Sequence, residues 1–170
     1  IWNTLLDGDA DATWVFMPWE GLLAERDDVD LTPFYLEEYG IPYGYTPVLL
    51  ARPGTIADDP DRLSAFLDAT ARGYRFAAEH PEEAADILRT TATGMDEDDA
   101  AFLRESQRRL AEALLTPDGE WGRMDDDRWA AFVEWLSEQG ILTTLDGEQL
   151  PAAELPAAEL YTNGLLDRAT

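Results

Sequence analysis

A short stretch near the N-terminus combines two indole rings with a carboxylate. Trp14, Trp19 and Glu20 follow one another closely, and Trp19 directly follows a proline. Indole rings stack on flat heteroaromatic ligands, and a carboxyl group hydrogen-bonds to polar ring edges. Trp14 has a structural alternative in the core of a strand, and Glu20 beside the dipole of a first helical turn. Asp11 is a further candidate contact, with capping of the next segment as its alternative.

A second aromatic group surrounds a bend. Tyr39, Tyr43 and Tyr45 lie in a segment that also holds two glycines and a proline. Their rings and hydroxyl groups can line a ligand cleft. The alternative is a turn stiffened by proline, in which the rings pack incidentally. The pattern leaves both interpretations open.

The sequence lacks the residues of most catalytic and metal sites. Cysteine is absent and His80 is the single histidine, which excludes disulfides and argues against a histidine-based metal site or triad. His80 stands at a predicted helix end, where a cation interacts favourably with the dipole. The acidic runs 96–99 and 125–127 precede predicted helices and do not follow the alternating spacing of a calcium loop. We expect no metal, no cofactor and no catalytic residue.

Short strands are predicted early in the chain and helices later. Segments rich in β-branched, aromatic and apolar residues predict strands over 12–17, 31–36 and 45–52. Helix-start residues and apolar faces predict helices over 18–26, 60–80, 81–91, 96–115 and 125–139. This order is typical of an α/β or α+β fold. The late helices have little sheet of their own to cover, so we expect the chain to be incomplete as a self-sufficient α/β domain.

The composition is strongly acidic. The chain has 36 Asp and Glu residues against 12 basic residues, all arginine, and a formal net charge of −24. A sequence-independent nucleic-acid binder needs a basic surface, so this charge rules that class out. The charge also argues against adsorption to an anionic membrane surface. No apolar run is long enough to span a bilayer. This charge is typical of a halophilic protein, because salt screens the repulsion; the alternative is a GC-rich genome, whose codons favour Arg, Ala, Asp and Glu.

An ordered set of segments carries a resemblance to a known family. The segments are LDGDADA (6–12), PWE (18–20), the helix and its following turn at 60–85, WAAFVEWL (129–136) and YTNGLL (161–166). In this order they resemble the substrate-binding proteins of ABC importers for thiamine-pyrimidine precursors. The wider group includes sulfonate, taurine and nitrate binders. The resemblance spans most of the chain, from about residue 5 to residue 166.

This resemblance implies a fold. Its members have two α/β lobes joined by a hinge, the type II periplasmic-binding-protein fold, and the lobes close on the ligand. The chain resembles the helix-rich C-terminal half. Residues 1–44 would form the end of the second, ligand-cleft lobe and the hinge crossover. Residues 45–170 would form a strand and the helices that return to the first lobe.

The resemblance also implies a function, the binding of an aminopyrimidine thiamine precursor without catalysis. Such a ring presents an acceptor nitrogen beside an amine donor, and the resemblance implies that Glu20 meets this edge with two hydrogen bonds. The expected ligand-binding residues are Glu20, Trp19, Trp14, Tyr43, Tyr45 and Asp11. We expect a monomer that delivers its small-molecule ligand to an ABC permease. An extracytoplasmic location follows from the resemblance alone.

Two alternatives remain from the sequence. A sulfonate, taurine or nitrate binder needs arginine side chains or helix N-termini in its cleft to bind the anion. Residues 11–20 contain no arginine, which argues against this alternative. A pyrimidine-synthase-like enzyme of thiamine biosynthesis is similar in fold and shares the Trp-Glu pair. The catalytic histidine and cysteine-rich segment of that family have no match here.

Overall fold

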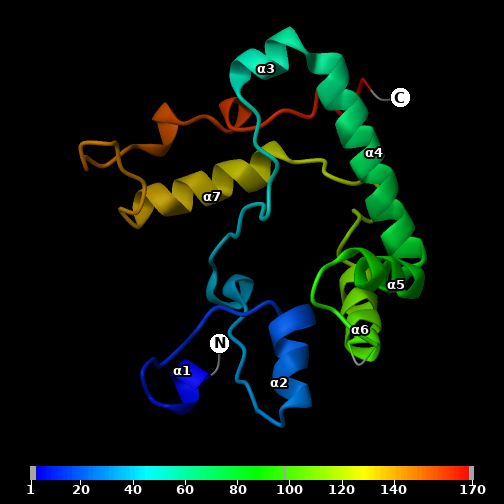
Figure 1. The fold of residues 1–170 in the computed structure, drawn as a ribbon. Coiled ribbons are helices and arrows are strands. Elements are labelled where there is room, and N and C mark those ends of the chain that lie inside the picture. The colour runs from blue at the N-terminus through cyan, green and yellow to red at the C-terminus, as the bar shows by residue number, and fades with distance from the viewer. Residues whose placement is uncertain (1–2, 98, 169–170) are drawn as a thin grey trace. The chain divides into compact units, whose positions relative to one another are not determined.

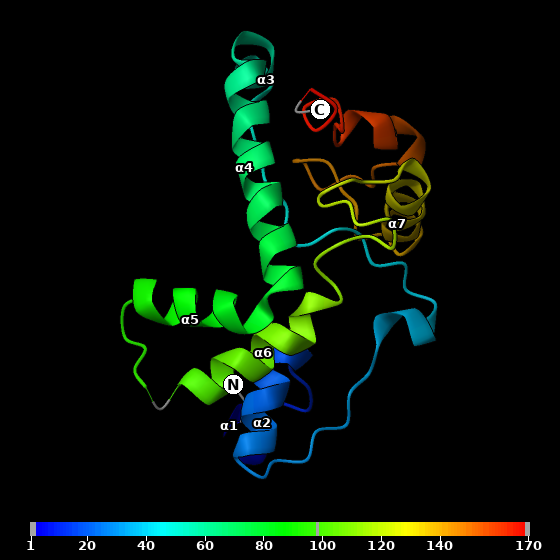
Figure 2. The same cartoon turned by 90° about the vertical axis from the view of Figure 1, so that its right-hand side faces the viewer.

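A computed structural model describes residues 3–97 and 99–168, so Asp98 of the first acidic run lies outside the described residues (Figures 1 and 2). The chain divides into two compact units. Unit 1 comprises Ile1–Pro33 and Ala71–Trp121, and unit 2 comprises Phe34–Thr70 and Gly122–Thr170. Helix α4 (Pro60–Glu79) contributes residues to both units.

Unit 1 is helical. After α1 (Asn3–Leu6), a single π-helical turn, η1 (Met17–Gly21), continues directly into α2 (Leu22–Arg26). Helices α5 (Pro81–Thr91) and α6 (Ala100–Ala111) lie side by side in both views, and α6 also packs against η1. The buried apolar side chains of this unit are Ala24, Ala71, Ala85 and Leu103. Small buried residues allow these short helices to approach closely.

Unit 2 is built around α7 (Asp126–Glu138). Its other regular elements are η2 (Leu36–Tyr39), α3 (Pro53–Asp58), the first half of α4, η3 (Ala152–Glu154) and η4 (Ala157–Glu159). The sequence PAAEL occurs twice, at 151–155 and 156–160, and each copy forms one of the last two 3₁₀ turns. Both turns pack against α7.

The predicted starts and ends of three long helices, α4, α5 and α7, are confirmed to within about one residue. Helices α4 and α5 begin at prolines, which suit a first helical turn because its N–H groups have no partner within the helix. Asp125 caps α7 by accepting a hydrogen bond from the Arg128 backbone N–H at 3.0 Å. Helix α6 is shorter than the predicted 96–115. At its end the Ala113 N–H bonds to Leu110 at 2.9 Å, which tightens the chain into turns.

The predicted strands over 12–17, 31–36 and 45–52 are wrong for the described residues, which form no strand there. Their residue types do favour extended backbone. Phe16 has φ −98° and ψ 114°, and Tyr35 has φ −82° and ψ 124°. The local preference is therefore realised at these positions without producing a sheet.

The missing feature is a pairing partner. Within residues 3–97 and 99–168 the single β-bridge joins Thr143 to Gln149. Strand propensity depends on cross-strand neighbours, and a stable sheet needs about three strands with a common apolar face. The described chain is thus helix-rich, and the α/β class remains a prediction. No helix in the described part is long and apolar enough to cross a membrane.

Candidate ligand site

One wall of the candidate site is formed by η1 and α2 in unit 1. Trp19, Leu23 and Arg26 are spaced at i, i+4 and i+7, so they share one face of this helical segment. The Glu20 carboxylate accepts a hydrogen bond through Oε2 from the Phe16 backbone N–H at 2.9 Å. This bond closes the start of the helical segment and fixes the turn that carries Trp19.

The facing wall comes from the start of α6 and the loop before it. Asp99, Phe102 and Leu103 are spaced at i, i+3 and i+4 and therefore lie on one face. Leu103 is 2% exposed and anchors this face in unit 1. Gly94 has a φ of +84°, a conformation that side chains disfavour, and its turn brings Met95 to the edge of the site.

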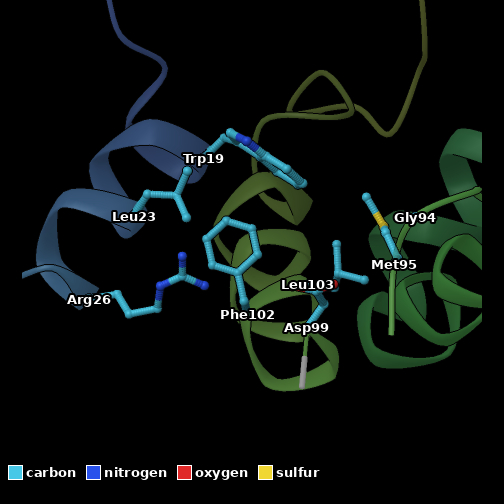
Figure 3. A pocket seen from close by; sticks show the side chains of 8 residues that line it. All are labelled: Trp19, Leu23, Arg26, Gly94, Met95, Asp99, Phe102 and Leu103. Carbon is cyan, nitrogen blue, oxygen red and sulfur yellow. The ribbon is translucent and has the colours of Figure 1, made fainter. Parts of the chain in front are cut away.

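These residues line an open pocket of about 200 Å³, here called the Trp19 cavity (Figure 3). The Trp19 ring meets the Phe102 ring edge-on, with 4.8 Å between centroids and 82° between planes. The guanidinium carbon of Arg26 lies 5.4 Å from the centroid of Phe102. Since a dry cavity of about 150 Å³ holds benzene, the Trp19 cavity is large enough for one single-ring heteroaromatic group.

An ion-pair clamp holds the two walls together. Arg109 on α6 donates from Nη1 and Nη2 to the two carboxylate oxygens of Glu25 on α2, at 2.8 and 2.7 Å. Its Nε donates to Oε1 of Glu105 at 3.0 Å. The hydrogen bonds from Arg109 lower the pKa of both carboxyl groups below their usual value and raise the pKa of Arg109. Because Glu25 directly precedes Arg26, the clamp fixes the part of α2 that lines the cavity.

A second contact supports the α6 wall from the other side. Arg104 donates through Nε and Nη2 to the carboxylate of Asp86 on α5, at 2.7 to 3.1 Å. This paired geometry is the strong arrangement for arginine and a carboxylate. Helix α6 is therefore held to α2 in its last turn, through Arg109, and to α5 nearer its start, through Arg104.

Unit 2 holds a separate aromatic group on α7. The Tyr45 ring lies 5.8 Å from the Trp129 ring, and the Tyr45 hydroxyl accepts a hydrogen bond from the Asp125 N–H at 2.9 Å. The guanidinium carbon of Arg128 lies 4.5 Å from the Tyr45 centroid. The same side chain donates to the two carbonyls before Tyr45, at 3.2 and 3.1 Å.

The same group includes further rings along the first half of α7. Tyr43 packs against Phe132 with 6.1 Å between centroids. The Tyr161 ring stacks at 6.3 Å on Trp129, and its hydroxyl donates to Asp126 at 2.8 Å. This hydrogen bond to a carboxylate raises the pKa of Tyr161 to about 12. We call these rings the α7 aromatic cluster, consisting of Tyr43, Tyr45, Trp129, Phe132 and Tyr161.

The predicted ligand residues fall in different places. Trp19 lines the Trp19 cavity, whereas Trp14 does not. Trp14 is 53% exposed and meets Phe16 edge-on at 6.2 Å, so the expected core position in a buried strand is wrong. Asp11 is exposed in the bend before it. Tyr39 is 61% exposed beside Phe34.

The single histidine and the acidic runs take structural positions. His80 stands between α4 and α5, and its ring packs 5.1 Å from Phe76. Asp125 caps α7, as predicted. Asp99 accepts a hydrogen bond from the Asp96 N–H at 3.1 Å. Among the residues that the structure describes, no group of three or more acidic or histidine side chains is placed to hold a metal ion.

Sequence reasoning did not find the cavity itself. Arg26, Met95 and Phe102 were not among the predicted contacts, although all three line it. The i, i+4, i+7 spacing from Trp19 to Arg26 is the signal that points to a shared face. Nothing local in the sequence indicates that α6 packs against that face.

Comparison with known proteins adds two findings. Residues 1–84 match the family described as NMT1/THI5 like. A formylaminopyrimidine-binding protein from Halalkalibacterium halodurans is 26% identical over 138 residues, which make up 78% of this chain and 41% of that relative. The chain therefore spans less than half the length of the curated relative that it matches.

Proposed function

Because residues 1–84 match the NMT1/THI5-like family, we propose that the chain is part of a substrate-binding protein for a thiamine-type aminopyrimidine. The protein holds the ring without catalysing a reaction. The Trp19 cavity carries this proposal, since it combines an indole, a second aromatic ring and room for a single-ring ligand. The relative from Halalkalibacterium halodurans, a formylaminopyrimidine-binding protein, agrees with that chemistry.

Trp19 provides the main contact. A flat ring stacked on the indole gains about 0.5–1.5 kcal/mol beyond the burial of its apolar surface. Leu23 and Met95 complete an apolar lining around the ring. This lining favours an uncharged heteroaromatic face and gives the ligand a defined plane.

Glu20 provides the polar contact in this proposal. Glu20 follows Trp19 in η1 but does not line the Trp19 cavity, and its carboxylate accepts a hydrogen bond through Oε2 from the Phe16 N–H. An aminopyrimidine edge offers a donor and an acceptor, so binding requires the carboxyl group to turn from this backbone N–H to the ring. Ligand contacts also remain predictions for four other residues, Trp14, Tyr43, Tyr45 and Asp11.

The wider proposal concerns the whole protein. Two α/β lobes of the type II periplasmic-binding-protein fold would close on the ligand, with residues 1–44 ending the second lobe and residues 45–170 returning to the first. The protein would act as a monomer outside the cytoplasm and pass its ligand to an ABC permease. The family match and the binding-protein relative support this role.

Calorimetric titration with formylaminopyrimidine tests the proposal. The chain is measured in about 2 M KCl, where the Debye length is below roughly 3 Å and carboxylate repulsion is screened. We expect saturable binding that Trp19→Ala weakens at least about tenfold, because it removes the stacking face. Glu20→Gln should weaken binding by about threefold to tenfold, since an amide replaces a charged hydrogen-bond acceptor.

Trp121→Ala is the matched control. Trp121 stacks on Tyr74 in the same unit, with 4.9 Å between centroids, and does not line the cavity. We expect this variant to bind like the wild type. Folded wild-type chain that shows no heat with formylaminopyrimidine would overturn the ligand class. Equal affinity in Trp19→Ala and the wild type would overturn the site.

A further inference from the structure

The C-terminal segment of unit 2 contains the single Asn-Gly pair of the sequence, Asn163-Gly164. Asparagine is one of the chemically labile side chains. A following glycine has no side chain to hinder attack by its own backbone nitrogen on the asparagine amide. The other asparagine, Asn3, precedes the β-branched Thr4, which crowds that nitrogen. Asn163 is therefore the position at which this chain is most ready to lose an amide spontaneously.

The reaction at Asn163 needs no reactant except water. The Gly164 backbone nitrogen attacks Cγ of Asn163, the new bond closes a succinimide ring, and the proton of that nitrogen leaves with the side-chain amide as ammonia. Water then opens the ring at one of its two carbonyls and leaves aspartate or isoaspartate. The side chain thereby gains a negative charge, and isoaspartate also lengthens the main chain by one carbon.

Both reacting groups are held by hydrogen bonds in the folded chain. Oδ1 of Asn163 accepts a hydrogen bond from the Met124 backbone N–H at 3.1 Å, and Nδ2 donates to the Met124 carbonyl at 2.8 Å. The Gly164 N–H donates to Oγ1 of Thr162 at 3.1 Å. These bonds must break before the Gly164 nitrogen can approach the Asn163 side chain. The fold therefore holds the pair in an unreactive arrangement.

The turn that follows is anchored as well. The Asn163 carbonyl accepts hydrogen bonds from the Leu166 and Asp167 N–H groups at 2.9 and 3.2 Å. Leu165 is 8% exposed, and its carbonyl accepts a hydrogen bond from Oγ of Ser64 on α4 at 2.7 Å. Figures 1 and 2 show this end of the chain, in red, beside the first half of α4. The reaction therefore requires the C-terminal segment to open locally.

The product does not restore the native contacts. Aspartate at position 163 has no N–H to donate to the Met124 carbonyl, and it places a negative charge beside that oxygen. The added charge falls in a chain whose net charge is already −24. The extra carbon of isoaspartate displaces the turn that carries Leu165. A chain that has reacted therefore keeps a weakened C-terminal segment.

We propose that Asn163-Gly164 is a deamidation site whose reaction the fold suppresses. The pair stays intact while the C-terminal segment is packed against α4 and the Met124 backbone, and it reacts when that segment opens. Deamidation then converts a transient opening into a permanent covalent change. This inference does not depend on the ligand proposed for unit 1.

Peptide mapping by mass spectrometry tests the proposal on the whole chain. The chain is incubated at mildly alkaline pH in about 2 M KCl, which screens its carboxylates, with and without unfolding urea. We expect Asn163 to deamidate at least about tenfold more slowly in the folded chain, because the rate follows the population of the open segment. Asn3 should remain intact in both samples. Equal rates at Asn163 overturn the suppression by the fold, and an intact Asn163 in urea overturns the site.

Two serine variants test the anchoring at a distance from the reacting pair. Ser64→Ala removes the hydrogen bond to Leu165 and should speed deamidation of the folded chain about threefold to tenfold, with no change in urea. Ser106→Ala is the matched control, because Ser106 is equally buried, at 3% against 5% exposed, but lies on α6 in unit 1. Circular dichroism establishes that each variant is folded. A folded Ser64→Ala chain that reacts at the wild-type rate would contradict the proposed opening.

Asn163→Asp reproduces one product of the reaction directly. We expect this variant to unfold at a lower urea concentration than the wild type, since the Met124 carbonyl loses its donor. This measurement does not depend on the rate of deamidation. An unchanged unfolding midpoint would show that the fold accommodates the product, and it would overturn the proposed permanent change.

Discussion

The Trp19 cavity and the α7 aromatic cluster are built from the same residue types, yet they differ in what their polar groups do. In the cluster, the Tyr45 hydroxyl bonds to Asp125, the Tyr161 hydroxyl to Asp126, and Arg128 to two backbone carbonyls. In the cavity, the Arg26 guanidinium lies over the Phe102 ring, and its Nε lies 3.8 Å from Oδ1 of Asp27 in a loose, exposed ion pair.

This difference separates structure from binding. Polar groups inside a packed region are normally satisfied by the protein, and an arrangement that does so stabilises the fold. A solvent-exposed polar group with a loose partner at the wall of a cavity can exchange that partner for a ligand. Aromatic and arginine residues alone therefore do not mark a site; the state of their hydrogen bonds does.

The largest expected difference between the two regions is in the free energy of unfolding when a tryptophan is replaced by alanine. Trp129→Ala should lower the free energy of unfolding by about 2 kcal/mol, because it removes a partly buried ring that contacts Tyr45 and Tyr161. Trp19→Ala should cost about 1 kcal/mol, since one side of its ring faces the cavity. Urea unfolding followed by far-ultraviolet circular dichroism measures both. Equal losses in the two variants would contradict the distinction between a packed cluster and a binding cavity.

The Arg109 clamp predicts a smaller effect, visible in acid. The pKa of Glu25 is lowered in the fold, so its contribution to stability is present above the usual carboxyl value of 4.5 and is lost as the pH falls through the lowered value. Glu25→Gln should be less stable than the wild type near neutral pH, and the gap should close in acid. Glu83→Gln removes a charge on α5 outside the clamp and serves as the control. A gap that is independent of pH would show that the clamp does not involve the charged carboxylate.

The smallest expected effect concerns the ionisation of Tyr161 in the α7 aromatic cluster. Its pKa is raised from 10.0 to about 12 by the hydrogen bond to Asp126. The stability from this contact is present below pH 10 and is lost as the pH rises through the raised value. Ultraviolet titration should show a late-ionising phenol in the wild type, and Tyr161→Phe should remove it. Asp126→Asn should shift it back toward 10; an unchanged curve would contradict the assignment.

The helices could be predicted because their determinants are local. Pro60, Pro81 and Asp125 start helices through their own backbone geometry or capping hydrogen bond, and the structure confirms each. The strands could not be predicted in the same way. Phe16 and Tyr35 do adopt extended backbone, but a strand exists through hydrogen bonds to another segment.

The candidate site also has features that depend on local sequence and features that depend on tertiary packing. The sequence by itself determined that Trp19 and Glu20 stand in a helical turn, that residues 1–84 match the NMT1/THI5-like family, and that the chain has an excess of acidic charge and no cysteine. Tertiary packing decided that Phe102 meets Trp19, that Arg109 clamps Glu25, and that Arg26 faces a cavity. The physical reason is that caps and turns depend on neighbours along the chain. A cavity and an ion pair depend on residues that the chain brings together only after it folds.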